Sequence, residues 1–133
     1  MLAWEGASHA RVELTLLGGA AMRRLNRRVT GRRGLTDVIA LALPQPDGKL
    51  VGDVYLCPSA AQRWVKGRGR GDPKGLPGGR GEGGTVAEEL VRLAVHGTLH
   101  VLGFDHPEGP GRTRSAMWRR QERYVRRLSD GAR

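Results

Sequence analysis

Three of the four histidines in this 133-residue chain lie within the eleven residues from His96 to His106. His96 and His100 are four residues apart, so on a helix they lie on one face, roughly 6 Å apart along the axis. Both imidazoles can then reach a single ion. Gly103 follows, and glycine readily adopts the left-handed conformation that ends a helix. The turn would bring His106 back to the same ion as a third ligand.

Three neutral imidazoles suit Zn²⁺, although nickel, copper and iron also accept nitrogen ligands. No cysteine or further histidine completes a closed structural site, so we expect one Zn²⁺ per chain with a fourth position open to water, as in catalytic zinc sites. The catalytic group would be that water, and the pattern identifies no catalytic side chain. The alternative is that the three histidines have ordinary structural roles.

The run His-x-x-x-His-x-x-x-x-x-His has the spacing of the long zincin pattern. It differs at one position, because Gly97 stands where a zinc peptidase has its general-base glutamate. Without that carboxylate, peptide hydrolysis lacks a proton acceptor. A zinc peptidase or related metallohydrolase is therefore an alternative that Gly97 argues against.

The whole run, His-Gly-Thr-Leu-His-Val-Leu-Gly-Phe-Asp-His, resembles the signature of the YbeY family of bacterial metal-dependent endoribonucleases and ribosomal RNA maturation factors. The resemblance extends from about Leu14 to about Leu128. Its other parts are the pairs and triplets Leu25-Asn26, Thr36-Asp37-Val38, Gly52-Asp53 and Glu89-Leu90.

This resemblance implies an α+β fold, with a small mixed sheet of about four strands and helices packed over it. It implies a zinc-dependent, single-strand-specific endoribonuclease in maturation of the 16S ribosomal RNA 3′ end and in ribosome quality control. RNA and the small ribosomal subunit would be its partners. The attacking group could be a water on the metal or the RNA 2′-hydroxyl, and a 2′,3′-cyclic phosphate product would indicate the latter.

The chain departs from the family pattern in its basic residues. The family places an arginine where this chain has Thr30, and a Ser-Phe pair where it has Ala40-Leu41. Arg28 or Arg32 could bind substrate in place of the missing arginine. The loss of that arginine favours a further alternative, a ribosome-associated RNA-binding assembly factor whose metal is mainly structural.

Composition is consistent with an RNA partner. The formal charge is +10, from 23 Lys+Arg against 13 Asp+Glu, and neutralising phosphates releases condensed counterions. A genome rich in arginine codons would give the same bias. The length predicts one domain over residues 1–133. The single Cys57 fits a reducing cytoplasm, and no stretch approaches the roughly 20 apolar residues of a membrane span.

Hydrophobic periodicity predicts the remaining elements. We expect residues 1–10 to be a loose segment, 11–16 a half-buried strand, and 20–29 a helix with a basic outer face. Residues 37–43 are almost continuously apolar and predict a central strand buried on both faces. A turn at Asp47-Gly48 then leads to a strand over 50–57 and a short helix capped by Ser59.

The C-terminal half is predicted to be helical after a loop. Residues 66–84 are rich in glycine and charge and predict a flexible loop, either an arm that touches RNA or a solvated spacer. Thr85 is expected to cap the histidine-bearing helix, and residues 113–128 form the last helix.

Several polar residues near these elements have two possible roles. Asp105 could orient a histidine or cap the turn. Asp53 and Glu89 could support the metal site, but a structural polar role is favoured for both. Thr36 and Asp37 are expected to organise the turn before the 37–43 strand.

Overall fold

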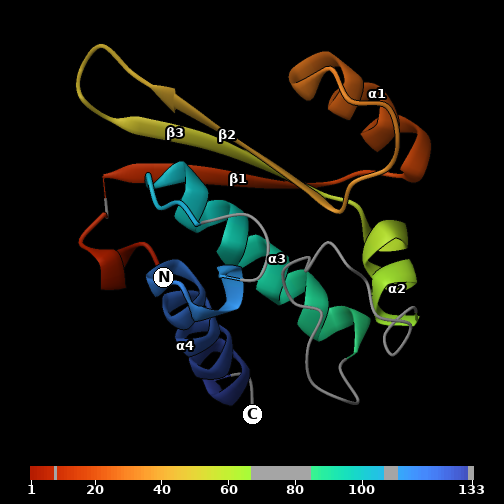
Figure 1. The fold of residues 1–133 in the computed structure, drawn as a ribbon. Helices are drawn as coiled ribbons and strands as arrows, with labels where there is room; N and C mark the ends of the chain where they lie inside the picture. Colours follow the sequence, from red (N-terminus) through yellow and green to blue (C-terminus); the bar gives the residue numbers. More distant parts are fainter. Residues whose placement is uncertain (8, 67–84, 107–110, 132–133) are drawn as a thin grey trace.

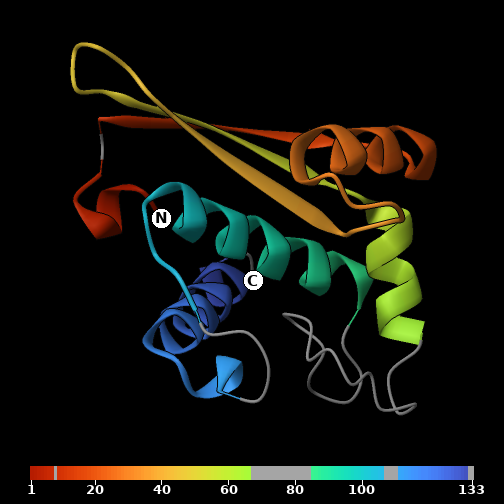
Figure 2. The same cartoon turned by 45° about the horizontal axis from the view of Figure 1, so that its top comes forward.

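The computed structural model describes residues 1–7, 9–66, 85–106 and 111–131. Strands β1 (Ala10–Leu16), β2 (Val38–Pro44) and β3 (Leu50–Leu56) form a sheet in the order β1-β3-β2. β1 runs parallel to β3, and β2 pairs with β3 as an antiparallel hairpin. Helices lie over this sheet (Figures 1 and 2), so the predicted α+β fold is confirmed. Within the part of the chain that the structure describes, the sheet has three strands, and the expectation of about four was wrong.

The hairpin turn lies where the sequence predicts it. Gly48 has a φ of 82°, and the Oδ1 atom of Asp47 accepts a hydrogen bond from the backbone N–H of Lys49. The position of β2 differs from the prediction. It is an edge strand, and β3 is the central one. Only the first half of β2 is largely covered by other residues. Leu43, in its second half, is 45% exposed, because the hairpin there extends beyond the helices.

The two faces of the sheet are covered by different helices. Helix α1 (Gly19–Thr30) packs on one face, through a cluster of Met22, Ile39 and Cys57. Helices α2 (Pro58–Lys66) and α3 (Val86–Val101) pack on the other face. That second cluster contains Val54, Leu56, Ala61, Leu93 and Val101. Alternate residues of β2 and β3 point to opposite faces, which explains why each strand serves both clusters.

Two glycines allow α3 to lie unusually close to the sheet. A Cβ atom at Gly97 would lie 2.6 Å from the Cγ1 atom of Val54, and one at Gly52 would lie 2.3 Å from the Cγ1 atom of Val101. Gly97 is on the helix and Gly52 is on β3, so each of the two elements has a glycine that leaves room for a valine of the other. The helix that carries the histidines is therefore held directly against the central strand.

Both ends of α3 are formed by local hydrogen bonds. The hydroxyl of Thr85 accepts from the backbone N–H of Glu88 at 3.1 Å, so the predicted cap is confirmed. At the other end, the N–H of Phe104 reaches the carbonyl of Leu99 and the N–H of Gly103 reaches that of His100, each at 3.0 Å. Gly103 has a φ of 98°. This pair of bonds is a Schellman motif, and it ends the helix at the predicted glycine.

Helix α4 (Ala116–Gly131) packs against the side of α3 that faces away from the sheet (Figures 1 and 2). It follows a short 3₁₀ helix, Arg112–Arg114, so the predicted last helix starts later than expected. The interface is apolar and contains Val95, Leu99, Met117, Tyr124 and Val125. α3 is thus enclosed between the sheet and α4.

The N-terminal segment was expected to be loose but is packed on α4. Ala3–Glu5 form a 3₁₀ helix, and Trp4 stacks on Tyr124 with ring centroids 5.6 Å apart. Glu5 pairs with Arg120 at 2.7 Å and accepts a hydrogen bond from the hydroxyl of Tyr124. No periodic pattern predicts this packing, because these contacts involve single side chains.

Three smaller predictions need correction or remain outside the structure. Leu14 and Leu16 are 54% and 62% exposed, so the predicted buried face of β1 is incomplete. Helix α2 begins at Pro58, so Ser59 lies inside it and does not cap it. The predicted loop over 66–84 lies outside the described residues except for Lys66, the last residue of α2. Each helix that the structure describes is too short or too polar to cross a membrane.

The close contact at Gly97 predicts the effect of adding one methyl group. Gly97→Ala should lower the free energy of unfolding by roughly 1–3 kcal/mol, because overpacking the Val54 side chain outweighs the better helix propensity of alanine. Urea denaturation monitored by circular dichroism measures this change. Gly19→Ala is the matched control, since its nearest neighbour would be an ordinary 3.7 Å away. Equal free energies of unfolding for the two variants would show that the Val54 side chain moves aside with no loss of stability.

Candidate metal centre

The three histidines of the sequence motif converge in one cavity of about 660 Å³. His96 and His100 come from successive turns of α3, and His106 comes from the segment after the Schellman turn. One potential ligand atom from each ring lies within 4.8 Å of the other two. The fourth histidine, His9, is exposed and is not part of this group.

The hydrogen bonds of His100 show that the site suits a cation. Its Nδ1 atom lies 3.0 Å from the carbonyl oxygen of Phe104, which can only accept, so Nδ1 must carry the proton. Its Nε2 atom is then unprotonated and carries a free lone pair. This atom lies 3.1 Å from the Nε2 atom of His96. Two ligands about 2.0–2.1 Å from a tetrahedral zinc lie roughly 3.3 Å apart. The observed separation is close to that value.

Burial keeps His96 uncharged. The ring is 4% exposed, and burial lowers its pKa to about 3, with further lowering by His100, Arg112 and His106. The pKa of His100 is also lowered, first by burial and then by His106. Metal ligands must be deprotonated, so a cation would not compete with protons for His96 near neutral pH.

Arg112 is a residue of this site that the sequence did not reveal. It lines the cavity beside the histidines. For His96 and His100, burial lowers the pKa most, and the charge of Arg112 lowers it further. For Asp37, burial has the largest effect and raises the pKa, whereas the charge of Arg112 lowers it. Arg112 is the only arginine or lysine among the described residues that line the cavity. Its position six residues after His106 is the only sequence signal, and it is a weak one.

Asp37 also faces the cavity, in addition to its predicted place before β2. Its backbone carbonyl accepts from the N–H of Cys57 at 2.9 Å, which extends the antiparallel pairing of β2 with β3 by one residue pair. Its side chain lines the cavity and is 7% exposed, and Oδ2 has no hydrogen-bond partner among the described residues. Burial raises the pKa of Asp37 to about 6, although backbone N–H groups and Arg112 oppose the shift.

For three other carboxylates the sequence allows two roles, support of the metal site or a structural contact. These are Asp105, Asp53 and Glu89. Asp105 lines the cavity, and its Oδ1 atom accepts from the backbone N–H of His106 at 2.8 Å, which is a turn-forming contact. Asp53 on β3 and Glu89 on α3 are not among the residues that line the cavity. Glu89 is 1% exposed and pairs with Arg92 at 3.6 Å, as a structural role requires.

The arginines proposed to replace the family arginine lie elsewhere. Arg28 is exposed near the end of α1, Arg32 is exposed in the loop after it, and neither lines the cavity. The prediction that they bind RNA remains a prediction. Thr30, at the position of the family arginine, lies 2.8 Å from both the backbone oxygen and the Oδ1 atom of Asn26. Its hydroxyl therefore stabilises the end of α1.

The raised pKa of Asp37 predicts a pH-dependent gain in stability for Asp37→Asn. Above about pH 6 the folded protein holds a buried charge, and removing it should stabilise the metal-free protein by up to about 3 kcal/mol. The gain should shrink as the pH falls from about 6 to 3.8 and vanish below, where the carboxyl is protonated in both folded and unfolded chains. Urea denaturation at pH 7.5 and pH 4 measures it. Asp130→Asn, at the exposed end of α4, is the control, and a gain independent of pH would contradict the prediction.

Comparison with known proteins agrees with this geometry. The family model described as Endoribonuclease YbeY matches residues 3–129. Proteins named Endoribonuclease YbeY from Moorella thermoacetica and Anaeromyxobacter are 37% and 35% identical over 117 and 107 residues. Each alignment covers 79% of this chain, but only 65% and 48% of those relatives. The chain thus spans about half to two thirds of the length of the curated relatives it matches.

A solved structure supports the fold. The solution structure of a Thermotoga maritima protein has a TM-score of 0.52 and 22% sequence identity, covering 86% of this chain and 65% of that one. With the family model matched from Ala3 to Ser129 and the three histidines gathered in one cavity, the chain belongs to the YbeY endoribonuclease family.

Proposed function

We propose that this protein is a metal-dependent endoribonuclease that cuts single-stranded RNA during ribosomal RNA maturation. The observation that carries the proposal is the convergence of His96, His100 and His106 in a cavity that also contains Arg112. Relatives named as endoribonucleases and the formal charge of +10 support it. Action at the 16S 3′ end, small-subunit binding, a role in ribosome quality control and a cytoplasmic location are parts of the same proposal.

The three histidines would hold one Zn²⁺, because neutral imidazole nitrogens suit that ion. When bound, the ion would supply Lewis-acid stabilisation of charge on a phosphate oxygen. The chain's own residues determine what enters the cavity. Arg112 offers a planar guanidinium that can hold a phosphate by two hydrogen bonds. It lines the same cavity as the histidines, so the arginine and a bound ion could act on the same phosphodiester.

The packing of Gly97 argues against a peptidase. The glutamate of a zinc peptidase would have to project from this position, and a Cβ atom there would already lie 2.6 Å from Val54. The position expected for a general base is therefore filled by the sheet. An RNA-binding assembly factor with a structural metal is the remaining alternative, and it predicts no cleavage by the purified, metal-loaded protein.

The first test removes one ligand. His100→Ala should abolish zinc binding and RNA cleavage, because two remaining imidazoles cannot form the site, while the apolar core of α3 stays intact. Metal content by elemental analysis, cleavage of a labelled single-stranded RNA and circular dichroism measure the three properties. Wild-type protein that retains zinc but cuts no RNA would support the assembly-factor alternative.

The second test addresses Arg112. Arg112→Met should slow RNA cleavage at least about tenfold with zinc content unchanged, because it removes the charge that binds phosphate but no metal ligand. Single-turnover cleavage rates measure the effect. Arg114→Met is the matched control, since Arg114 is exposed in the same 3₁₀ helix and does not line the cavity. Equal rates for the two variants would exclude Arg112 from substrate binding.

A further inference from the structure

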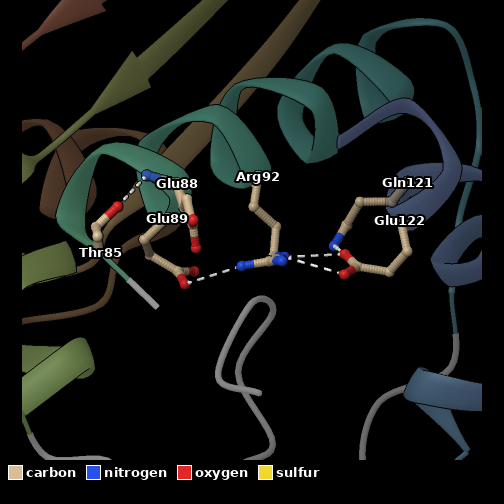
Figure 3. Close-up of polar contacts among 6 residues, drawn as sticks. All are labelled: Thr85, Glu88, Glu89, Arg92, Gln121 and Glu122. Atoms are coloured by element: carbon tan, nitrogen blue, oxygen red, sulfur yellow. Dashed lines mark hydrogen bonds and ion pairs between the residues drawn. The ribbon is translucent and has the colours of Figure 1, made fainter. Parts of the chain in front are cut away.

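A chain of buried hydrogen bonds leads away from the candidate metal centre into the contact between α3 and α4. The Nδ1 atom of His96 lies 2.7 Å from the Oε1 atom of Gln121, which is fully buried on α4. The amide nitrogen of Gln121 donates to Glu122 Oε2 at 3.0 Å (Figure 3). A polar side chain in an apolar interface is costly unless both ends of its amide are bonded, as they are here.

Arg92 of α3 holds the far end of this chain. Its Nε atom lies 2.9 and 3.2 Å from the two carboxylate oxygens of Glu122, and its side chain is 13% exposed. The same guanidinium approaches the buried Glu89 at 3.6 Å (Figure 3). Glu122 is therefore held on one side by a cation that can only donate hydrogen bonds.

We propose that Gln121 is a positioning residue, oriented by Glu122 and Arg92, that fixes His96 in the tautomer whose Nε2 lone pair faces the metal centre. This inference rests on the proposed metal site and identifies what orients one of its ligands.

The direction of every hydrogen bond in this series is determined by the carboxylate of Glu122 at its far end. The Glu122 carboxylate accepts only, so the amide group that faces it must be the NH₂ of Gln121. The carbonyl oxygen of Gln121 must then face His96, and the proton between them must be on Nδ1. Nε2 is left unprotonated, as the bond to Phe104 leaves it in His100. An amide turned the other way would place a donor against Nδ1 and favour the opposite tautomer.

A purely structural role for these residues makes different predictions. If the chain only joins α3 to α4, its loss lowers stability and leaves the imidazole of His96 unchanged. Mutation of a residue that hydrogen-bonds to a metal-binding histidine, in contrast, typically lowers metal affinity by 10- to 100-fold. Metal affinity and ring protonation therefore separate the two roles, and stability alone does not.

The experiment uses the full-length polypeptide and two variants of it. Gln121→Met keeps the approximate volume of the side chain but removes both polar groups. Glu122→Gln replaces the acceptor by an amide that can also donate, so the orientation of Gln121 is no longer imposed. Glu88→Gln is the matched control, because Glu88 is an exposed carboxylate on α3 outside the chain (Figure 3). Zn²⁺ affinity is measured by competition with a chromophoric chelator, and the tautomer of His96 by ¹⁵N NMR of the metal-free protein.

We expect Gln121→Met to weaken Zn²⁺ binding 10- to 100-fold and to convert His96 from one tautomer to a mixture. Glu122→Gln should cause a smaller change in the same direction, and it decides the question if Gln121→Met does not fold. Unchanged affinity and an unchanged tautomer in a folded variant would overturn the proposal. If wild-type protein binds no Zn²⁺, the proposed metal site fails, whereas the tautomer measured without metal still tests the role of Gln121.

Discussion

The contact between α3 and the central strand is the constraint on which the site depends. Gly97 and Gly52 are the two positions at which side chains are absent, and each accommodates a valine from the opposite element. This brings the backbone of α3 close to β3 and places His96 in the same cavity as Asp37, the residue before β2. A larger residue at either position would move the helix away from the sheet and separate the histidines from the opposite wall of the cavity. The same packing explains why a glycine occupies the position of the peptidase glutamate.

Much of the fold and the grouping of the three histidines could be predicted from local sequence. The His96–His106 run, the Thr85 cap and the Gly103 turn each depend on residues within one or two helical turns, so their geometry follows from spacing. The errors concern longer-range packing. The apolar run of β2 resembles a central strand, yet it is an edge strand whose first half is covered by helices on both faces. Hydropathy reports that a residue is covered but not whether a strand or a helix covers it.

Arg112 and Gln121 could not be assigned from the sequence for the same reason. Arg112 is one of many arginines, and only its place on the cavity wall distinguishes it. Gln121 falls on the apolar side of α4 between Met117 and Tyr124. A polar residue in that pattern indicates a buried hydrogen bond, but its partner, His96, lies 25 residues earlier. The sequence predicts Asp37 as a turn residue, whereas its burial in the cavity depends on the histidine-bearing helix α3 on the other side of that cavity.

The two histidines on α3 are oriented by different kinds of partner. His100 is bonded to a main-chain carbonyl in the turn that ends its own helix, whereas His96 is bonded to the side chain of a residue on another helix. A main-chain acceptor persists whatever residue occupies position 104, as long as the turn forms. Sequence drift can therefore leave one ring untouched while altering the other. If the three histidines bind a metal, substitutions on α4 could change the affinity of the site without replacing any of the three.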